Sequence, residues 1–430
     1  MKKLVGQDNA AKNSLIINLR AFLVSFGANT ASSYIGVYGV LLGSSPIEMG
    51  MLQAFSNSLS NAGQLFWGRL SDRTGYRRPW IFAASIALAI NWILMAFIRT
   101  PYELIISYSI MSLISAMIAV NWFSLLTDIS RYGSRGSFLS YINNISGTGN
   151  LISLLAMVFL LHGISRDQLV VPFSLGSVSY IASAILISKV KEVRRKTVLT
   201  KNIIRTVSEA RNNRYFFNYF MAMNVQGFFW SMAWPIFPIT IVSVMHFSLP
   251  MVSALTATNI VFTMLIQRAV GNLADRINRV PLIFANRIML GFIPLMYGYF
   301  SNFLEFMGME VYSGIASGLQ NVVMNSYLMD IVPEGHRGEY ISIINGFNGI
   351  IYFAGSMSGG LILSNFLGYL PLHAAVAITF TIIAAGRFTS SFLFLGLKEP
   401  EARRGRPNPF IGILSRVFSG LPSGGVPRQR

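Results

Sequence analysis

The stretch GRLSDRTGYRRPW, from Gly68 to Trp80, places a cluster of charges between two long apolar runs. The chain is 53% hydrophobic and 12% charged, so such a cluster stands apart from its surroundings. A related stretch, GNLADRINRVP, follows from Gly271 to Pro281. The apolar runs around the two clusters predict the fold class, and the clusters indicate how the fold is organised.

Apolar runs recur along the whole chain, each long enough to cross roughly 30 Å of hydrocarbon as a helix. Lipid offers the backbone no hydrogen-bond partner, so runs of this length are expected to be helical. A mean hydropathy of +0.53 agrees with a membrane protein. We therefore predict an all-α membrane protein with twelve transmembrane helices, near residues 15–43, 47–68, 79–98, 102–127, 135–162, 170–189, 215–245, 249–271, 280–300, 303–329, 336–365 and 372–397.

Lys and Arg lie mainly in the loops after the even-numbered spans and in the two tails, whereas the odd loops hold Arg99, Arg166 and little more. Basic loops stay on the cytoplasmic side. We therefore expect a multi-pass protein of the cytoplasmic membrane with both termini in the cytoplasm. The net charge of +18 follows from this topology and needs no nucleic acid as a partner. The absence of Cys excludes disulfides and thiol chemistry.

The second half of the chain repeats the first. The segment Asp128 to Gly147 aligns with Asp330 to Gly349 at an offset of 202 residues, and the two charged clusters align at an offset of 203. Each half then has six spans with the same sidedness, which predicts parallel repeats related by an axis along the membrane normal. The expected domains are a six-helix bundle at 1–190, a basic cytoplasmic linker at 191–213, a second bundle at 214–400 and a cytoplasmic tail at 401–430.

GRLSDRTGYRRP resembles the loop 2–3 pattern of the major facilitator superfamily, Gly-x-Leu-x-Asp-Arg-x-Gly-Arg-Arg/Lys, with Tyr76 where a basic residue is usual. The Asp…Arg-Gly segments after the fourth and tenth spans are also similar to that superfamily. The resemblance covers about residues 14 to 400. It implies two pseudo-symmetric six-helix bundles that face each other across a central cavity, which opens alternately to each side of the membrane.

The resemblance also implies a gate at the cytoplasmic ends of the bundles. Gly68 lets two helices come close, and Asp72 can accept hydrogen bonds at the start of a helix of the opposite bundle while it pairs with a cation. The alternative is that these loops only fix topology. The candidate gate residues are Gly68, Asp72, Arg73, Gly75, Arg77, Arg78, Asp128, Arg135, Gly271, Asp275, Arg276, Asp330 and Arg337.

In the superfamily that the chain resembles, spans 1, 4, 7 and 10 line the cavity. Amides and aromatic rings on these spans suit a neutral or amphipathic solute. For any single residue the alternative is a contact between helices. The candidate cavity residues are Arg20, Asn29, Tyr34, Asn121, Trp122, Gln226, Trp230, Trp234, Gln320 and Asn321.

Glu310 is the candidate for an acid inside the membrane, seven residues after the start of the tenth predicted span. This places it about 10 Å below the outer surface. Charges at such depth are costly and usually functional, and desolvation favours the protonated form that a proton carrier needs. Glu310 is therefore the candidate for proton coupling; binding a cationic group of the solute and bonding a neighbouring helix are the alternatives. Arg287 and Arg387, on the ninth and twelfth spans, are expected to be structural.

We expect a monomeric secondary transporter that moves a small organic solute by alternating access, with protons as the candidate coupling ion. A multidrug or metabolite efflux antiporter and a non-transporting sensor on the same fold are the alternatives. An enzyme is not expected, because Ser/His and paired-Asp constellations at one depth are absent. His162, His246, His336 and His373 lie apart near span ends, so neither a metal nor another cofactor is expected.

Overall fold

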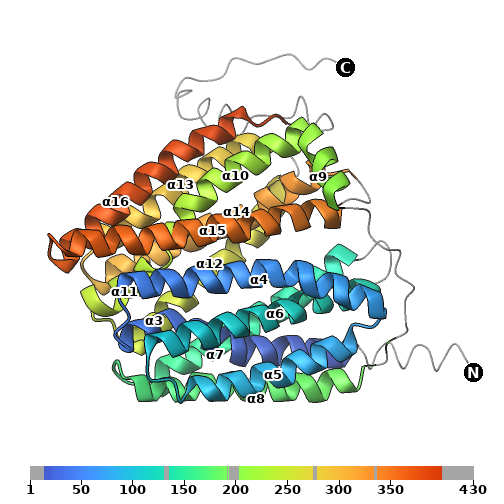
Figure 1. Ribbon diagram of the computed structural model, residues 1–430, viewed down its shortest axis with the longest axis horizontal. Helices are drawn as coiled ribbons and strands as arrows, with labels where there is room; N and C mark the ends of the chain where they lie inside the picture. The colour runs from blue at the N-terminus through green and yellow to red at the C-terminus, as the bar shows by residue number, and fades with distance from the viewer. Residues whose placement is uncertain are drawn as a thin grey trace, which may run out of the picture.

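The computed structural model describes residues 14–129, 135–190, 192, 203–274, 278–333 and 337–399. All regular structure in these ranges is helical, which confirms the all-α fold class. The helices of the first half of the chain fill the lower part of Figure 1, and those of the second half fill the upper part. Most of the long helices run across the view, so that their ends lie at two faces of the molecule.

Helical residues 14–24 open the first half. They continue into η1 (Ser25–Asn29), α2 (Thr30–Ser32), α3 (Ile35–Leu41), α4 (Pro46–Thr74), α5 (Arg78–Met95), α6 (Pro101–Ile129), α7 (Arg135–Leu160), η2 (Arg166–Leu169) and α8 (Val170–Ser188). The second half consists of α9 (Ile203–Asn212), α10 (Arg214–Met232), α11 (Ile236–Ile239), η3 (Thr240–Val244), α12 (Leu249–Ala274), α13 (Arg279–Tyr299), α14 (Phe303–Ile331), α15 (Arg337–Leu367), α16 (Leu372–Ser391) and η4 (Phe392–Gly396). Each of the twelve predicted spans thus contains helix.

Among the described residues, nine helices are long and apolar enough to cross a membrane. The first, second and tenth predicted spans are helical but do not reach that apolar content. On α4, for example, Gln53, Asn57, Asn61 and Gln64 interrupt the apolar pattern. Such residues can be carried by a membrane helix when it faces other helices rather than lipid.

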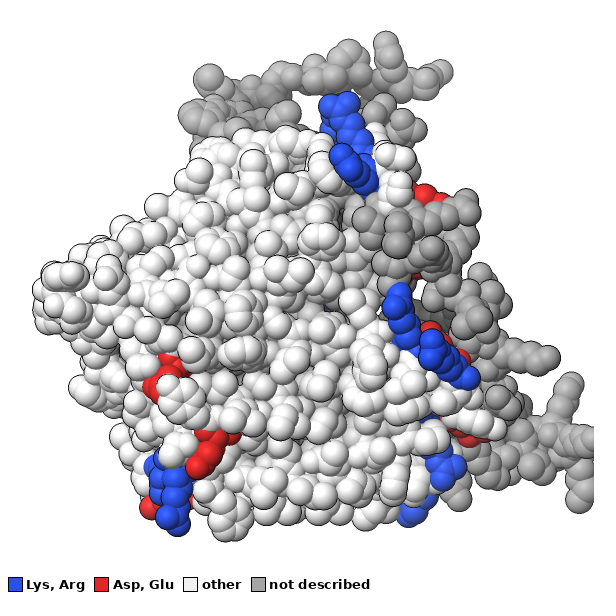
Figure 2. All heavy atoms as spheres, viewed as in Figure 1, with Lys and Arg blue, Asp and Glu red and all other residues white. Residues whose placement is uncertain are grey.

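We call the face with residues 72–78, 192 and 330 the basic face, and the face with residues 43–46, 161–166 and 246–249 the opposite face. Figure 2 shows Lys and Arg along the right edge of the molecule and again at its lower left. The broad area between these charges is white on the visible side. An uncharged surface between two charged ends is what a bilayer requires of a protein that spans it.

The two halves meet along two pairs of helices, α4 with α15 and α7 with α12. Glycine allows the first pair to approach closely, since a Cβ added at Gly360 would lie 2.4 Å from the Pro46 carbonyl oxygen. Nearer the middle of the same pair, the Ser58 hydroxyl donates to the Gly349 carbonyl at 2.6 Å. Small residues at helix contacts of this kind are typical of membrane proteins.

Arg387, buried on α16, joins three helices through backbone carbonyls. It donates from Nη1 to Leu290 and from Nη2 to Trp230, both at 3.0 Å, and from Nε to Phe229 at 3.5 Å. Pro294 has no N–H to bond the Leu290 carbonyl within α13, so the arginine supplies the missing donor. These contacts agree with the structural role expected of Arg387.

Helix α14 packs closely on α12 through two glycines one turn apart. A Cβ added at Gly314 would lie 2.7 Å from the Asn259 carbonyl oxygen, and one at Gly318 would lie 2.8 Å from that of Thr263. The Thr263 hydroxyl also donates to the Gly314 carbonyl at 3.2 Å. The spacing of four residues places both glycines on one side of α14, where they let the two backbones approach.

We expect Arg387→Met to lower the free energy of unfolding by about 1–3 kcal/mol, because the Leu290 carbonyl then lacks a donor in a dry environment. Unfolding of the purified protein in mixed micelles measures the change. Arg99→Met, at an exposed position of the opposite face, is the matched control and should leave stability unchanged. Equal stability of the two variants would show that the carbonyls held by Arg387 need no donor from it.

Gly314→Ala should force α12 and α14 apart, because its methyl group meets a backbone oxygen that cannot rotate away. The expected loss of stability is about 1–3 kcal/mol. Gly308→Ala on the same helix is the control, since an added Cβ there has no neighbour within 4 Å. The same unfolding assay compares the two, and a Gly314→Ala protein as stable as Gly308→Ala would contradict the close packing described above.

Candidate functional site

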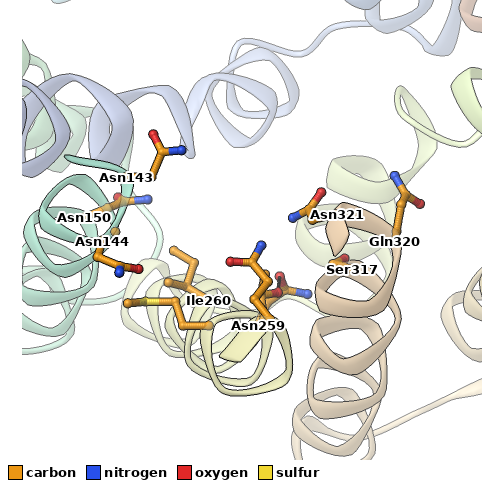
Figure 3. A pocket seen from close by; sticks show the side chains of 12 residues that line it. Asn143, Asn144, Asn150, Asn259, Ile260, Ser317, Gln320 and Asn321 are labelled. Atoms are coloured by element: carbon orange, nitrogen blue, oxygen red, sulfur yellow. Dashed lines mark hydrogen bonds between the residues drawn. The ribbon is translucent and has the colours of Figure 1, made fainter. Parts of the chain in front are cut away.

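A cavity of about 570 Å³ lies between the two halves of the chain. In Figure 3 carboxamides of α7 stand on one side of it, and Asn259, Ser317, Gln320 and Asn321 stand across from them. Of the lining residues that the structure describes, seven are Asn or Gln and none is charged. The lining comprises Asn143, Asn144, Gly147 and Asn150 of α7, Asn259, Ile260, Thr263, Met264 and Gln267 of α12, and Ser317, Gln320 and Asn321 of α14.

Each carboxamide carries two N–H donors and one oxygen acceptor, so this lining can bond many neutral polar groups. Some of the amides are fixed by the protein itself: the Thr30 hydroxyl donates to Asn150 Oδ1 at 3.1 Å. Others retain free capacity. The Oε1 atom of Gln320 is buried and has no hydrogen-bond partner in the described part of the chain. A buried acceptor without a donor is costly, and a bound solute with an O–H or N–H group would satisfy it.

Glu310 lies beside this cavity, on α14, and is half-buried. Its Oε2 accepts from Asn259 Nδ2 at 2.9 Å, and its Oε1 accepts from the Tyr297 hydroxyl at 3.3 Å. The same Asn259 nitrogen donates to the Ser313 hydroxyl at 3.1 Å. Asn259 therefore belongs both to the cavity lining and to the surroundings of the acid. Sequence reasoning found Glu310 but missed Asn259, whose only signal was an amide within an apolar span.

Two of the predicted cavity residues, Gln320 and Asn321, line the cavity. The others are not among its described lining residues. Among the rest, Arg20 is buried with its guanidinium 4.1 Å from the centre of the Trp122 ring. Asn121 is buried and donates to the Met117 carbonyl of its own helix at 2.8 Å. These three residues make contacts within the first half of the chain.

The remaining predicted cavity residues also form contacts with neighbouring helices or within their own helix. Gln226 accepts from Arg287 Nη1 at 3.0 Å, and the Trp230 ring lies 5.8 Å from the same guanidinium. Trp234 meets the Tyr352 ring edge-on at 5.0 Å. Asn29 is exposed and donates to the Ser25 hydroxyl at 3.3 Å.

Tyr34 connects the two halves near the opposite face, where its hydroxyl lies 2.6 Å from that of Ser253. The backbone N–H of Leu249 donates to the Gly163 carbonyl at 2.8 Å in the same region. Toward the basic face the contacts differ. Among the described residues, a Cβ added at Gly68 would meet only Val120 of its own half within 4 Å, and one at Gly271 would meet no atom. In the part of the chain that the structure describes, contacts between the halves extend from the opposite face through the middle of the molecule to Gln64 of α4 and Asn345 of α15.

Asp72, the central candidate for the gate, pairs within its own half. Its carboxylate lies 2.5 Å from Arg77 Nη2. The N–H groups of Arg77 and Arg78 at the start of α5 donate to Glu192, at 2.6 and 2.9 Å. Gly75 ends α4 with φ +71, a conformation that favours glycine.

The second half repeats part of this arrangement. The Val280 N–H, 203 positions after Arg77, donates to Glu399 at 2.6 Å. Asp330 pairs with Arg279 at 2.7 Å. The backbone at Asp275 and Arg276 and the side chains of Asp128, Arg135 and Arg337 lie outside the described residues, and Arg73 is exposed.

The sequence matches the model of the Major Facilitator Superfamily over residues 18–227 and again over 219–422. An uncharacterized MFS-type transporter of Methanocaldococcus jannaschii is 29% identical over 118 residues, which are 26% of this chain and 31% of that protein. The chain thus spans about a third of the length of this curated relative.

Solved structures share the fold at low identity. A nucleoside transporter, NupG, has a TM-score of 0.70 at 10% identity, over 90% of this chain and 100% of its own. A bacterial homolog of the human lysosomal transporter Spinster has a TM-score of 0.67 at 15% identity, over 91% and 98%. A peptide transporter, POT, has a TM-score of 0.68 at 14% identity, over 91% and 97%. Because the family model matches both halves of the chain, the chain belongs to the Major Facilitator Superfamily, and its apolar helices make it a multi-pass membrane protein.

Proposed function

We propose that the protein is a secondary transporter that moves a small, neutral, polar organic solute across the cytoplasmic membrane by alternating access. The uncharged, carboxamide-rich cavity between the two halves is the observation that supports this most. A charged solute would lose its water there without meeting an opposite charge on the lining, which is costly in a membrane interior. Hydroxyl and amide groups of a neutral solute would instead find both donors and acceptors.

The distribution of contacts between the halves supports the alternating-access part of the proposal. With the basic face in the cytoplasm, as its Lys and Arg favour, both termini are cytoplasmic and the structure is closed toward the outside. Gly68 and Gly271 lie nearer the basic face, where an added Cβ would meet no described atom of the opposite half within 4 Å. A single chain supplies both sides of the cavity, which supports function as a monomer.

The surroundings of Glu310 support its role as the proton site. Its hydrogen-bond partners among the described residues, Asn259 and Tyr297, are neutral. No described Lys or Arg forms an ion pair with Glu310, so the carboxylate has no countercharge to hold it permanently ionised. A buried acid in this setting is neutralised most readily by a proton.

The substrate class is tested with purified protein in two steps. Thermal stabilisation is screened against sugars, nucleosides, neutral peptides, organic anions and cationic drugs, and each stabilising solute is then tested for counterflow in proteoliposomes. Stabilisation and counterflow are expected with neutral, multiply hydrogen-bonding solutes. Counterflow confined to anions or to cationic drugs would overturn the neutral-solute proposal.

Glu310→Gln should abolish uptake driven by a pH gradient and preserve solute exchange, because exchange needs no net movement of protons. Both rates are measured in proteoliposomes with a solute that is positive in counterflow. Glu305→Gln, at the exposed start of the same helix, is the matched control and should transport like the wild type. Gradient-driven uptake by Glu310→Gln at the wild-type rate and with the wild-type pH profile would rule out the proton role; loss of exchange as well would point to solute binding.

Asp72→Asn should shift the protein toward the inward-facing state if Asp72 latches the cytoplasmic ends together. Because the chain has no Cys, spin labels can be placed at Arg69 and Arg268, which are exposed on α4 and α12. Double electron–electron resonance should show that the short-distance population shrinks in Asp72→Asn. Asp167→Asn on the opposite face is the control, and an unchanged distribution in Asp72→Asn would leave that residue without a latch function.

A further inference from the structure

Asn259 connects the lining of the cavity to Glu310, because it belongs to that lining and donates a hydrogen bond to the carboxylate. Its amide nitrogen donates to the carboxylate at 2.9 Å and to Ser313 at 3.1 Å, so both of its N–H groups are in use. Its Oδ1 lies 3.4 Å from the Thr263 hydroxyl. A carboxylate can only accept hydrogen bonds, which fixes the nitrogen of the amide toward Glu310. Asn259 nevertheless lines the cavity, where a solute can compete for the same group.

The bond between Asn259 and Glu310 depends on the charge of the acid. A hydrogen bond to an ionised carboxylate is roughly twice as strong as one between neutral groups. While Glu310 is ionised, the amide is therefore held against it. Once Glu310 carries a proton, the bond weakens and the amide N–H becomes available to an acceptor in the cavity.

Few other groups influence this acid. The titratable group that faces Glu310 among the described residues is Tyr297 of α13, which donates to its other oxygen. Helix α12 presents Asn259, and α14 itself presents Ser313 one turn away. Loss of the Asn259 bond thus removes one of the two donors that hold the ionised carboxylate.

We propose that Asn259 couples occupancy of the cavity to protonation of Glu310: a solute that engages the Asn259 amide withdraws a donor from the carboxylate and so favours uptake of a proton. The inference rests on the proposed role of Glu310 as the proton site. Linkage is reciprocal, so a proton on Glu310 strengthens solute binding to the same extent. Solute and proton then bind together, and the transport mode is symport rather than antiport. Asn259 acts as a positioning residue for the proton site and as a direct contact for the solute.

The link between Asn259 and Glu310 can be tested without knowledge of the solute. Infrared spectroscopy of the full-length protein in lipid follows the carbonyl band of the protonated acid as a function of pH, and the Glu310→Gln protein identifies which band belongs to Glu310. In Asn259→Leu, which has similar size but no donor, the midpoint of this titration should move to higher pH by about one unit or more. Tyr297→Phe removes the other donor and should move it in the same direction.

Asn321→Leu is the matched control, because it removes a carboxamide from the same cavity without a bond to Glu310; its midpoint should equal that of the wild type. If Asn259→Leu does not fold, Asn259→Ala is read in the same way. A Glu310 band that does not change with pH in the wild type would refute the proposed proton site. A titrating band whose midpoint is the same in the Asn259 variant, or shifts equally in Asn321→Leu, would refute the coupling through Asn259 and leave the proton site standing.

Discussion

Every polar group inside the hydrocarbon must find its partner within the protein, because lipid supplies none. The effect is clearest where proline breaks a helix. Pro294 leaves the Leu290 carbonyl without its helical donor, and Arg387 on a neighbouring helix takes that place. Pro235 likewise cannot donate to the Ser231 carbonyl, which accepts from the Trp234 N–H at 3.2 Å and from the Ser356 hydroxyl at 3.3 Å. Interrupted helices are tolerated because the bundle, and not the helix alone, satisfies the backbone.

The same constraint explains where the polar helices lie. Helices α4 and α14 are too polar to be recognised as spans by apolar content, and both face protein. On α4, Gln64 accepts from Asn345 of α15 at 3.1 Å. On α14, Gly314 and Gly318 bring the helix against α12 at the height of the cavity. The polar residues that weaken the hydropathy signal are those that form the seam between the halves and the cavity within it.

The sequence was enough to predict the number of spans, the internal repeat and the family, because these depend on length, apolar content and a repeated motif. It also singled out Glu310, Gln320 and Asn321, which the structure places at or beside the cavity. It did not predict the contribution of the fifth and eighth spans. The amides of these two spans, such as Asn150 and Asn259, lie far apart in the sequence, and only the approach of α7 and α12 brings them to one cavity.

The spacing of residues in the sequence could not indicate which buried charged side chains are held in place by contacts with other helices. Three buried arginines are held by groups that do not line the cavity: Arg387 by backbone carbonyls, Arg20 by the ring of Trp122, and Arg287 by Gln226 and the rings of Trp230 and Phe394. A cation against an aromatic face is stabilised by about 2 kcal/mol or more when it is desolvated. These contacts tie helices together and change little with the contents of a cavity.

Glu310 differs from the buried arginines in where one of its partners lies. Its carboxylate is held by hydrogen bonds from neutral side chains, and one of them, the amide of Asn259, lines the cavity. A hydrogen bond from a side chain can be exchanged for one to a solute, whereas a backbone carbonyl within a helix or a packed ring cannot be displaced in this way. A solute in the cavity can therefore alter the surroundings of Glu310 directly, through Asn259. The buried arginines tie helices together away from the described cavity lining, whereas the acid shares one of its partners with the cavity.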